Sequence, residues 1–255
     1  MRYSIFGEND YRKTIKQLLD ESGHIYDDLD PEFVFSVGGD GTILRAIKKY
    51  QSKVEDIYFV GINFGRLGFY TDFEEQEIEN LISMINCNQY KVCHYSLIEY
   101  SLNKNNEKSI GYALNELAII NPVHTQIIDV FISNEYFETF RGTGFLLSTP
   151  TGSTAYNKSL GGSVIDPKIK AFQLTEIASI NNRVYKTISS PLILPADTIV
   201  TLHSDFSNSY ITADGIDAKN DKITEIKCKL SNRQVKFIVK DEDGFWNRVR
   251  KSFLE

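Results

Sequence analysis

Cysteine, proline and long apolar runs are scarce in this sequence, and each scarcity excludes a class of protein. The 255 residues include three cysteines and six prolines. Cys87, Cys93 and Cys228 are odd in number and lack metal-ligand spacing, so neither a disulfide framework nor a zinc site is predicted. No apolar run is long enough to cross a bilayer, and none follows the basic residue near the start. We therefore expect an intracellular, cytoplasmic protein without a membrane partner.

An excess of positive charge is missing as well. The chain has 28 basic and 34 acidic side chains, a net charge of −6. This balance argues against a protein that coats a polyanion, so nucleic acid is not an expected partner. What is present is an ordinary globular composition, with 42% hydrophobic and 24% charged residues. The length suits one large domain or two small ones.

Strand and helix patterns alternate along the first hundred residues. The order is apolar at 3–6, helical at 11–21, apolar at 33–37, helical at 42–50 and apolar at 57–62. This alternation is typical of βαβ units on a parallel sheet. A further helix is predicted over 74–86, where apolar residues recur every three or four positions. We expect a first domain of residues 1–97.

The pattern changes to β-rich after about Val92. Strands are predicted at 97–102, 127–132 and 235–239, with helical patches after Thr154 and around 172–178. The tail over 245–254 carries one apolar stripe, and its natural packing partner is the first domain. We therefore predict a β-rich domain of residues 98–239 and a segment, 240–255, that returns to the first domain.

A glycine-rich loop, Gly38-Gly-Asp-Gly-Thr42, joins an apolar run to the next helix. Glycines at such a turn let backbone N–H groups approach a phosphate closely. The loop matches neither the Walker nor the dinucleotide fingerprint, and it carries a carboxylate, Asp40, where a phosphate would bind. Asp40 could simply be the N-cap of the helix. Because Thr42 could cap the helix by itself, we favour a role for Asp40 toward a substrate.

A second candidate is the stretch Thr149-Pro-Thr-Gly-Ser-Thr-Ala-Tyr-Asn-Lys-Ser-Leu-Gly-Gly162, which is dense in hydroxyls and small residues. It offers free backbone N–H groups, short polar side chains and one aromatic ring, Tyr156, to lie against a base. An ordinary Ser/Thr-rich turn would explain any part of it. The full order of residues favours a nucleotide site.

Polar residues interrupt apolar sequence at two further places. Asn115 and Glu116 stand inside the apolar strand predicted over 113–118, where alternation exposes only one of them, so a site explains the pair. Phe140-Arg-Gly-Thr-Gly-Phe145 by itself predicts a hairpin turn. The four histidines have no acid or nucleophile at telling spacing. Any general base is therefore a carboxylate.

Taken in order, the motifs resemble those of the bacterial NAD kinases. The matching stretches are Gly38–Thr42, Asn115-Glu116, Thr149–Tyr156 and Ala178-Ser-Ile-Asn-Asn-Arg183, within a similarity from about Glu32 to the Phe-Trp segment near the end. The resemblance implies a Rossmann-like α/β domain and a C-terminal β-sandwich domain with the active site between them. The apolar stripe of the tail adds a C-terminal helix that packs back on the first domain. The resemblance also implies phosphorylation of the 2′-hydroxyl of the adenosine ribose of NAD to give NADP. ATP or polyphosphate would be the donor, with a divalent cation such as Mg²⁺, in a homotetramer.

The resemblance implies roles for individual residues. Asp40 matches the proton acceptor for the ribose 2′-hydroxyl, with Gly41 beside it. Asn115 and Glu116 match the pair that holds the dinucleotide near the reacting ribose. The other residues implied to bind substrate are Arg141, Thr143, Thr151, Thr154, Ala155, Tyr156, Asn157, Lys158, Ser159, Ala178, Tyr185, Asp214 and Gly215.

Three positions depart from the pattern that this chain resembles. Thr143 stands where many relatives have an acidic residue, and Asn63 and Gly215 stand where histidine is common. These departures bear on the binding of the dinucleotide and leave Asp40 untouched. Two alternatives stay open: a kinase of the same superfamily that acts on a lipid or another hydroxyl, and a non-catalytic regulator that binds dinucleotides.

Overall fold

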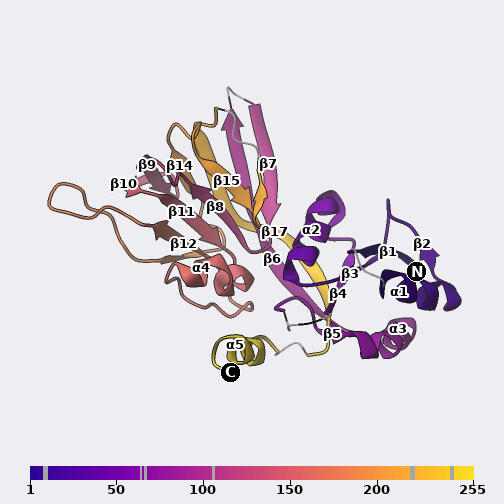
Figure 1. Cartoon of the computed structure of the whole chain (residues 1–255). Helices are drawn as coiled ribbons and strands as arrows, with labels where there is room; N and C mark the ends of the chain where they lie inside the picture. The colour runs from indigo at the N-terminus through magenta and orange to yellow at the C-terminus, as the bar shows by residue number, and fades with distance from the viewer. Residues whose placement is uncertain (8–10, 64, 66–67, 105–106, 219–221, 242–243) are drawn as a thin grey trace. The chain divides into compact units, whose positions relative to one another are not determined.

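The computed structural model describes residues 1–7, 11–63, 65, 68–104, 107–218, 222–241 and 244–255 (Figure 1). It divides into two compact units, the first made of Met1–Tyr95 and Gln234–Glu255, the second of Ser96–Arg233. The strands β6 (Lys91–Lys104) and β17 (Glu225–Val239) each contain one boundary between the units. The C-terminal segment thus joins the first unit from Gln234 on, earlier than the residue 240 expected from the sequence.

The first unit contains a parallel sheet. Its strands are β1 (Arg2–Phe6), β2 (Ile25–Tyr26), β3 (Phe33–Val37), β4 (Tyr58–Asn63), β5 (Phe73–Glu74) and the last residues of β17. β1 pairs with β2 and β3, and β4 pairs with β3, β5 and β17, all in parallel. Its helices are α1 (Tyr11–Glu21), α2 (Asp40–Lys49), α3 (Ile78–Asn86) and α5 (Phe245–Phe253), with 3₁₀ turns at Gln51–Lys53 and Glu75–Glu77.

Helices cover both faces of this sheet, which explains why its strands are almost continuously apolar. Alternate residues of β1 point to opposite faces. Tyr3 and Ile5 share a core with α1 and α3, whereas Ser4 points the other way and accepts a hydrogen bond from the Tyr50 hydroxyl at 2.9 Å. Figure 1 shows α2 on one side of the strands and α1 with α3 on the other. The α/β architecture predicted from the sequence is confirmed.

Two helix boundaries differ from the predictions. α2 begins at Asp40, so the N-cap is Gly39, and no side chain caps the helix. The suggestions that Asp40 or Thr42 is the cap are therefore wrong. The helix predicted from residue 74 begins at Ile78 instead, because Phe73 and Glu74 pair with β4 and a 3₁₀ turn follows. No helix of the described residues is long and apolar enough to span a membrane.

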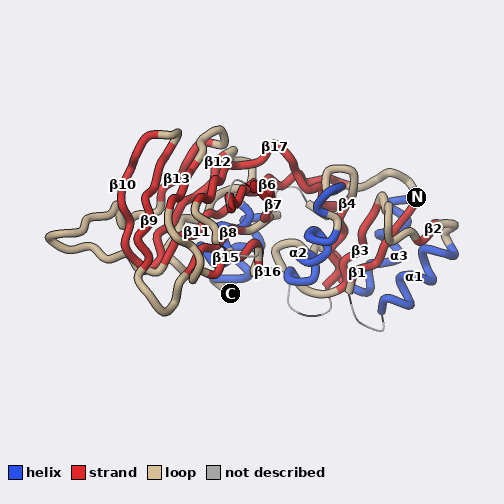
Figure 2. Tube along the Cα trace, turned by 90° about the horizontal axis from the view of Figure 1, so that it is seen from above, coloured by secondary structure: helices blue, strands red, loops and turns tan. Residues whose placement is uncertain are grey.

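The second unit is an antiparallel β-sandwich. It consists mostly of strands, whereas the first unit combines strands and helices (Figure 2). One sheet has the order β13-β12-β11-β8-β15-β16, and the other layer has β10, β9, β14 and β17, with β6 and β7 attached. The bounds are β7 (Glu107–Ala113), β8 (Glu116–Ile120), β9 (Gln126–Ile132), β10 (Glu135–Gly142), β11 (Gly144–Ser148), β12 (Ala171–Ile177), β13 (Leu192–Pro195), β14 (Val200–His203), β15 (Tyr210–Ala213) and β16 (Ile216–Asp217). A 3₁₀ turn, Thr151–Thr154, and α4 (Tyr156–Ser159) follow β11.

The sandwich core follows from period-two alternation. Leu117 and Ile119 of β8 face Ile128 and Val130 of β9 in one buried cluster. Ala118, between them in the sequence, points to the outer face. The predicted β-sandwich is confirmed.

Three local predictions in this unit are wrong. Residues 172–178 were expected to be helical, but β12 is a central strand between β11 and β13. Burial on both faces removes the alternation that would have identified it. The stretch 140–145 is no hairpin, since β10 pairs with β9 and β11 pairs with β8. The strand over 113–118 is two strands, because β7 ends at Ala113 and β8 begins at Glu116.

Candidate active site

Asp40 is held by backbone N–H groups from a distant segment of the first unit. Its Oδ2 accepts the N–H of Phe69 at 2.8 Å, and its Oδ1 accepts the N–H of Tyr70 at 2.9 Å. Burial raises the pKa of Asp40, while the two N–H groups and the charge of Arg248 lower it, and the net shift is upward. The carboxylate is therefore oriented and basic enough to accept a proton.

The segment that holds Asp40 approaches it very closely. A Cβ atom on Gly68 would lie 2.3 Å from Oδ1 of Asp40. The Gly68 N–H instead donates to Oγ1 of Thr71 at 3.1 Å, which closes a tight turn. Only glycine fits at this position without displacing the carboxylate.

A polar cavity of about 760 Å³ lies at the carboxyl ends of β1 and β3. Its walls include Gly38 and Thr42 of the glycine-rich loop and three cations, Arg12, Arg45 and Lys49. One of these charges is already partnered, because Nζ of Lys49 lies 2.5 Å from Oδ2 of Asp28. Ligands of parallel α/β sheets bind at this edge. Cations beside the N-terminus of a helix favour a phosphate-bearing ligand.

In the second unit, Asp214 fixes the backbone of the predicted Asn115-Glu116 pair. Its Oδ1 accepts the N–H of Asn115 at 2.7 Å and of Glu116 at 3.2 Å, and its Oδ2 accepts the N–H of Leu114 at 2.8 Å. Asp214 and Gly215 have φ of 54° and 72° and form the two-residue turn between β15 and β16. The Asp-Gly sequence suits this turn. The turn thereby aims the carboxylate at the junction between β7 and β8.

Glu116 is a buried carboxyl with an unused oxygen. Burial, and next the charge of Asp214, raise the pKa of Glu116 to about 8, against the N–H of Tyr156, which lowers it. Its Oε2 has no hydrogen-bond partner within the described residues. A group of this kind can donate or accept a hydrogen bond to a hydroxyl of a ligand. The carboxyl of Glu116 is therefore suited to form a hydrogen bond with a sugar hydroxyl.

The hydroxyl-rich stretch 149–162 packs directly on the same junction. Oγ1 of Thr149 donates to the carbonyl of Leu114 at 2.6 Å, and a Cβ on Gly152 would lie 2.0 Å from the carbonyl oxygen of Asn115. Thr151, Ser153 and Thr154 are buried, and Oγ1 of Thr154 donates to the carbonyl of Thr151 at 3.1 Å. These hydroxyls fold the loop.

Beyond those hydroxyls, the same stretch divides into exposed and buried residues. Tyr156, Lys158 and Ser159 are exposed, and Ala155 is half-buried. Asn157 is fully buried, and its Oδ1 accepts the hydroxyl of Thr175 at 2.9 Å. Its amide nitrogen donates to the carbonyls of Ser153 and Ser163. Asn157 therefore anchors the loop to the outer face of β12.

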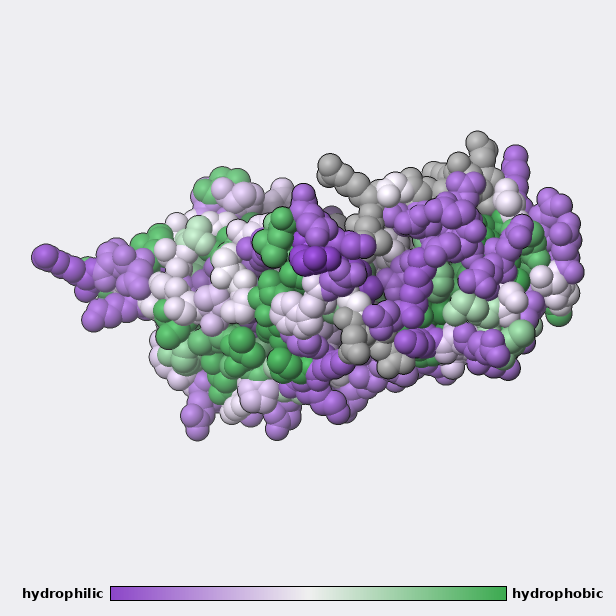
Figure 3. All heavy atoms as spheres, turned by 90° about the horizontal axis from the view of Figure 1, so that it is seen from below, coloured by the Kyte–Doolittle hydropathy of each residue, from purple (hydrophilic) through white to green (hydrophobic). Residues whose placement is uncertain are grey.

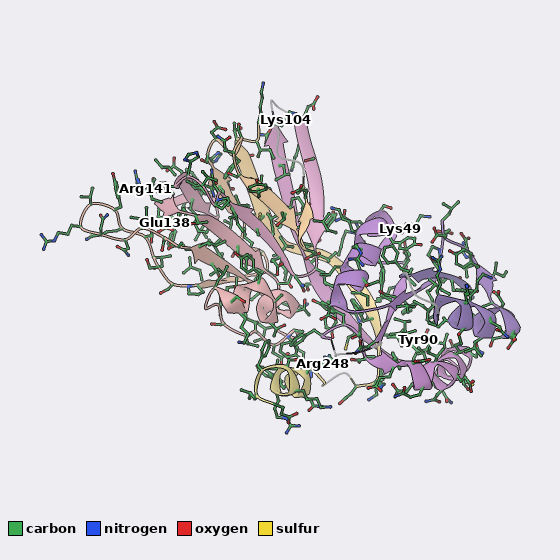
Figure 4. The ribbon with its side chains drawn as sticks, in the orientation of Figure 1. Lys49, Tyr90, Lys104, Glu138, Arg141 and Arg248 are labelled. Carbon is green, nitrogen blue, oxygen red and sulfur yellow. The ribbon has the colours of Figure 1, made fainter. Side chains whose placement is uncertain are left out.

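The remaining candidates form a separate group around the end of β10. The guanidinium of Arg141 lies 4.1 Å from the ring centre of Tyr185, and Ala178 has φ of 47°. The carbonyl of Thr143 accepts the side-chain N–H of Gln126 at 2.6 Å. Figure 4 shows Arg141 on β10 with Glu138, whose Oε2 accepts the N–H of Ile188 at 2.9 Å. β10 thus holds the loop that carries Tyr185.

Several residues of these sites were missed from the sequence. The N–H donors of Phe69 and Tyr70 act through the backbone, which leaves no side-chain signal. A glycine at position 68 is compatible with a close contact, but the sequence does not show that the contacting residue is Asp40. The cations Arg12 and Arg45 come from two helices, and only the fold places them around one cavity.

Comparison with known proteins places these features in a family. A family model described as the ATP-NAD kinase N-terminal domain matches residues 7–90, and one described as the ATP-NAD kinase C-terminal domain matches 114–239. The NAD kinase of Lactobacillus acidophilus is 39% identical over 255 residues, which cover 96% of this chain and 95% of the relative. NAD kinase 1 of Bacillus anthracis is 40% identical over 262 residues, which cover 100% and 99%.

Solved structures agree on the fold. Yeast NADH kinase complexed with NADH has a TM-score of 0.85 at 21% identity, covering 100% of this chain and 87% of that one. An NAD kinase from Archaeoglobus fulgidus in complex with ATP has a TM-score of 0.79 at 23% identity, covering 98% of each. The fold, an α/β unit and a β-sandwich, is thus shared with these two structures. On the sequence matches, the chain belongs to the NAD kinase family, and the lipid-kinase alternative is not favoured.

Proposed function

We propose that this protein transfers a phosphoryl group from ATP to the 2′-hydroxyl of the adenosine ribose of NAD, giving NADP. The observation that carries the proposal is the geometry of Asp40 in the glycine-rich loop. Its carboxylate is oriented by the backbone N–H groups of Phe69 and Tyr70. A ribose hydroxyl is a poor nucleophile until a base within hydrogen-bond reach takes its proton as the new P–O bond forms. Asp40 supplies that base, and its raised pKa makes it a stronger proton acceptor at any pH at which the carboxylate is ionised.

The donor binds, in this proposal, in the cavity at the carboxyl ends of β1 and β3. Arg12 and Arg45 offer positive charge to the phosphates of ATP, and Gly38 leaves room for them. Gly41 continues the same loop at the start of α2, where N–H groups have no partner inside the helix. The description of the Archaeoglobus enzyme as a complex with ATP supports ATP as donor. Use of polyphosphate stays a prediction.

The dinucleotide is held, we propose, by residues of the second unit. Asn115 and Glu116 bind ribose hydroxyls, and the unused Oε2 of Glu116 is free for one of them. Tyr156 offers an exposed ring for a base, and its neighbours Ala155, Lys158 and Ser159 are accessible as well. Asn157, Thr151 and Thr154 act indirectly, by fixing the loop. Asp214 and Gly215 position the 114–116 backbone.

The group around Arg141 and Tyr185, with Thr143 and Ala178, is assigned to the same dinucleotide. Arg141 stacks on Tyr185 and keeps that ring in place. Thr143 brings no charge, so it contacts the dinucleotide only as a neutral group.

The divalent cation implied by the family fits this chain only as a companion of the nucleotide. The described residues contain no group of three His, Cys, Asp or Glu side chains that could hold an ion. Mg²⁺ in kinases commonly keeps several waters and takes most of its protein-site ligands from substrate phosphates. When bound to ATP, the ion would neutralise charge on the phosphates. Orientation of the hydroxyl and removal of its proton remain the work of the protein.

The proposal is tested by assaying NADP formation from NAD, ATP and Mg²⁺. We expect turnover by the natural protein, and a loss of about 10²- to 10⁴-fold in kcat for Asp40→Asn. The amide nitrogen of Asn would face one of the two N–H groups, but Asp40 is not among the residues proposed to hold the dinucleotide, so binding of NAD by calorimetry should change by less than about twofold. Asp56→Asn, an exposed acid after α2, is the matched control and should retain full turnover.

Two results would contradict the proposal. Absence of NADP under conditions where a relative is active would remove the kinase function, and NAD binding without ATP consumption would favour the regulator instead. Nearly full turnover by Asp40→Asn would be compatible with the kinase function and would contradict only the role of Asp40 as the base.

Assembly and location follow from the family resemblance and stay predictions. A homotetramer would bury some of the large apolar side chains that the second unit exposes, among them Ile127, Phe137, Ile193 and Tyr210. Figure 3 shows apolar surface on the side of the molecule seen there. Exposed apolar surface favours self-association where it is contiguous. We expect the protein to act in the cytoplasm, where NAD and ATP are both available.

A further inference from the structure

The C-terminal helix α5 grips the segment that holds Asp40. Nη1 of Arg248 lies 2.5 Å from Oδ1 of Asp72, and both side chains are only 9% exposed. The ring of Phe69 lies 6.2 Å from that of Phe245 and 5.9 Å from that of Phe253, centre to centre. Figure 4 shows Arg248 on α5. α5 therefore contacts both ends of the short segment 69–72.

The same segment orients the carboxylate of Asp40 through the N–H groups of Phe69 and Tyr70. Asp72 is fixed a second time, because its Oδ2 accepts the N–H of Lys240 at 3.2 Å. The positive charge of Arg248 also acts directly on Asp40 and favours its ionised form. Arg248 thus acts on Asp40 in two ways: through the backbone of segment 69–72, which it holds by Asp72, and through the electrostatic effect of its positive charge.

Stability alone is a poor explanation for this ion pair. Burying two charges costs desolvation free energy, which their attraction recovers only when the remaining polar atoms are also satisfied. Nε of Arg248 is buried and has no hydrogen-bond partner among the described residues. The pair is better explained by what it does to its neighbours.

We propose that Arg248 is a positioning residue for Asp40: through its ion pair with Asp72 it holds the 69–72 segment, whose N–H groups orient the Asp40 carboxylate. This inference rests on the proposed role of Asp40 as the base. Among the described residues, the charged and ionisable groups that act on Asp40 or on the pair include Arg248, Asp72 and Tyr95. Burial raises the pKa of Tyr95, so its hydroxyl stays neutral. It contributes no titration in the working range.

The experiment measures kcat against pH at saturating NAD and ATP for the natural protein and for Arg248→Met, Arg248→Lys and Arg250→Met. Removing the charge of Arg248 should raise the pKa of Asp40, so the acid-side midpoint of kcat should move to higher pH. Loss of the contact with Asp72 should also misplace the 69–72 segment, so kcat should fall about tenfold even on the plateau of the profile. Arg248→Lys keeps the charge and should restore the midpoint. Arg250, exposed on the same helix and 3.4 Å from Glu255, is the control and should leave both unchanged. Ionisation of ATP affects all four proteins equally.

A merely structural role would give a different result. Arg248→Met with an unmoved midpoint, or Arg250→Met with the same shift, would overturn the inference. Adding Arg248→Met to Asp40→Asn should cause no further loss of kcat, and a full additional loss would also overturn it. If Arg248→Met does not fold, the test uses Arg248→Lys and Asp72→Asn. Asp72→Asn with full kcat and an unchanged pH profile of kcat would contradict the proposal that Arg248 acts on Asp40 through Asp72. An active Asp40→Asn enzyme would instead show that Asp40 is not the base.

Discussion

The carboxylate of Asp214 accepts the backbone N–H of Asn115 at 2.7 Å, across a sequence separation of 99 residues. This contact fixes the junction of β7 and β8 that the proposed dinucleotide site uses. Its strength can be measured by replacing the acceptor.

Asp214→Asn should lower the free energy of unfolding by about 1 to 3 kcal/mol, because an amide replaces one acceptor oxygen by a donor that faces an N–H group. Urea denaturation measures the change. Asp217→Asn, an exposed acid of the same hairpin, is the control and should stay within about 0.5 kcal/mol of the natural protein. Equal effects of the two substitutions would contradict the importance of the Asp214 contact.

The pH dependence of stability should carry the signature of Glu116. Its pKa is raised from 4.5 to about 8 in the folded protein, so the folded state binds a proton that the unfolded state has lost. The contribution of this group is therefore fully present below pH 4.5 and is lost as pH rises toward 8. Glu116→Gln should remove this slope, so the variant gains stability relative to the natural protein between pH 5 and pH 8. Urea denaturation across that range would refute the assignment if the two slopes are the same.

The cations around the cavity should set the affinity for ATP. Arg45→Gln should raise the Kd for ATP about fivefold, equivalent to about 1 kcal/mol, because an exposed cation contributes modestly to a charged contact. Lys13→Gln makes the same charge change on the exposed side of α1 and should have little effect. Calorimetry of both variants decides whether this cavity is the donor site. Equal Kd values for Arg45→Gln and the natural protein would place ATP elsewhere.

Gly68→Ala should impair turnover without unfolding the protein. The new Cβ would lie 2.3 Å from Oδ1 of Asp40, at the movable end of that side chain, so the carboxylate is displaced and the fold is kept. A displacement of about 1 Å in a catalytic group costs up to about 10²-fold, and we expect a loss of about 10- to 100-fold in kcat. Gly65→Ala, where a Cβ would meet nothing within 4 Å, is the control. Normal kcat in Gly68→Ala would show that the orientation of Asp40 is unimportant.

Local periodicity in the sequence was enough to predict most of the elements of the first unit. α1 and β3 lie where their patterns predicted, because each has one apolar face or a short buried run between turn residues. β12 was misread as a helix, since a strand buried on both faces has no alternation to identify it. Ordered motifs such as Gly38–Thr42 and Thr149–Tyr156 were sufficient for the family, because they depend on residue order and need no contact information.

What the sequence by itself determined is therefore the alternation of elements and the motif order, and it was enough to propose Asp40 as the base. Only the tertiary structure decided what surrounds that carboxylate. The N–H groups of Phe69 and Tyr70, the ion pair of Arg248 with Asp72 and the contact of Asp214 with Asn115 all join residues 29 or more positions apart. Such contacts depend on how strands are ordered and how chain segments return, and a backbone N–H group carries no mark in the sequence.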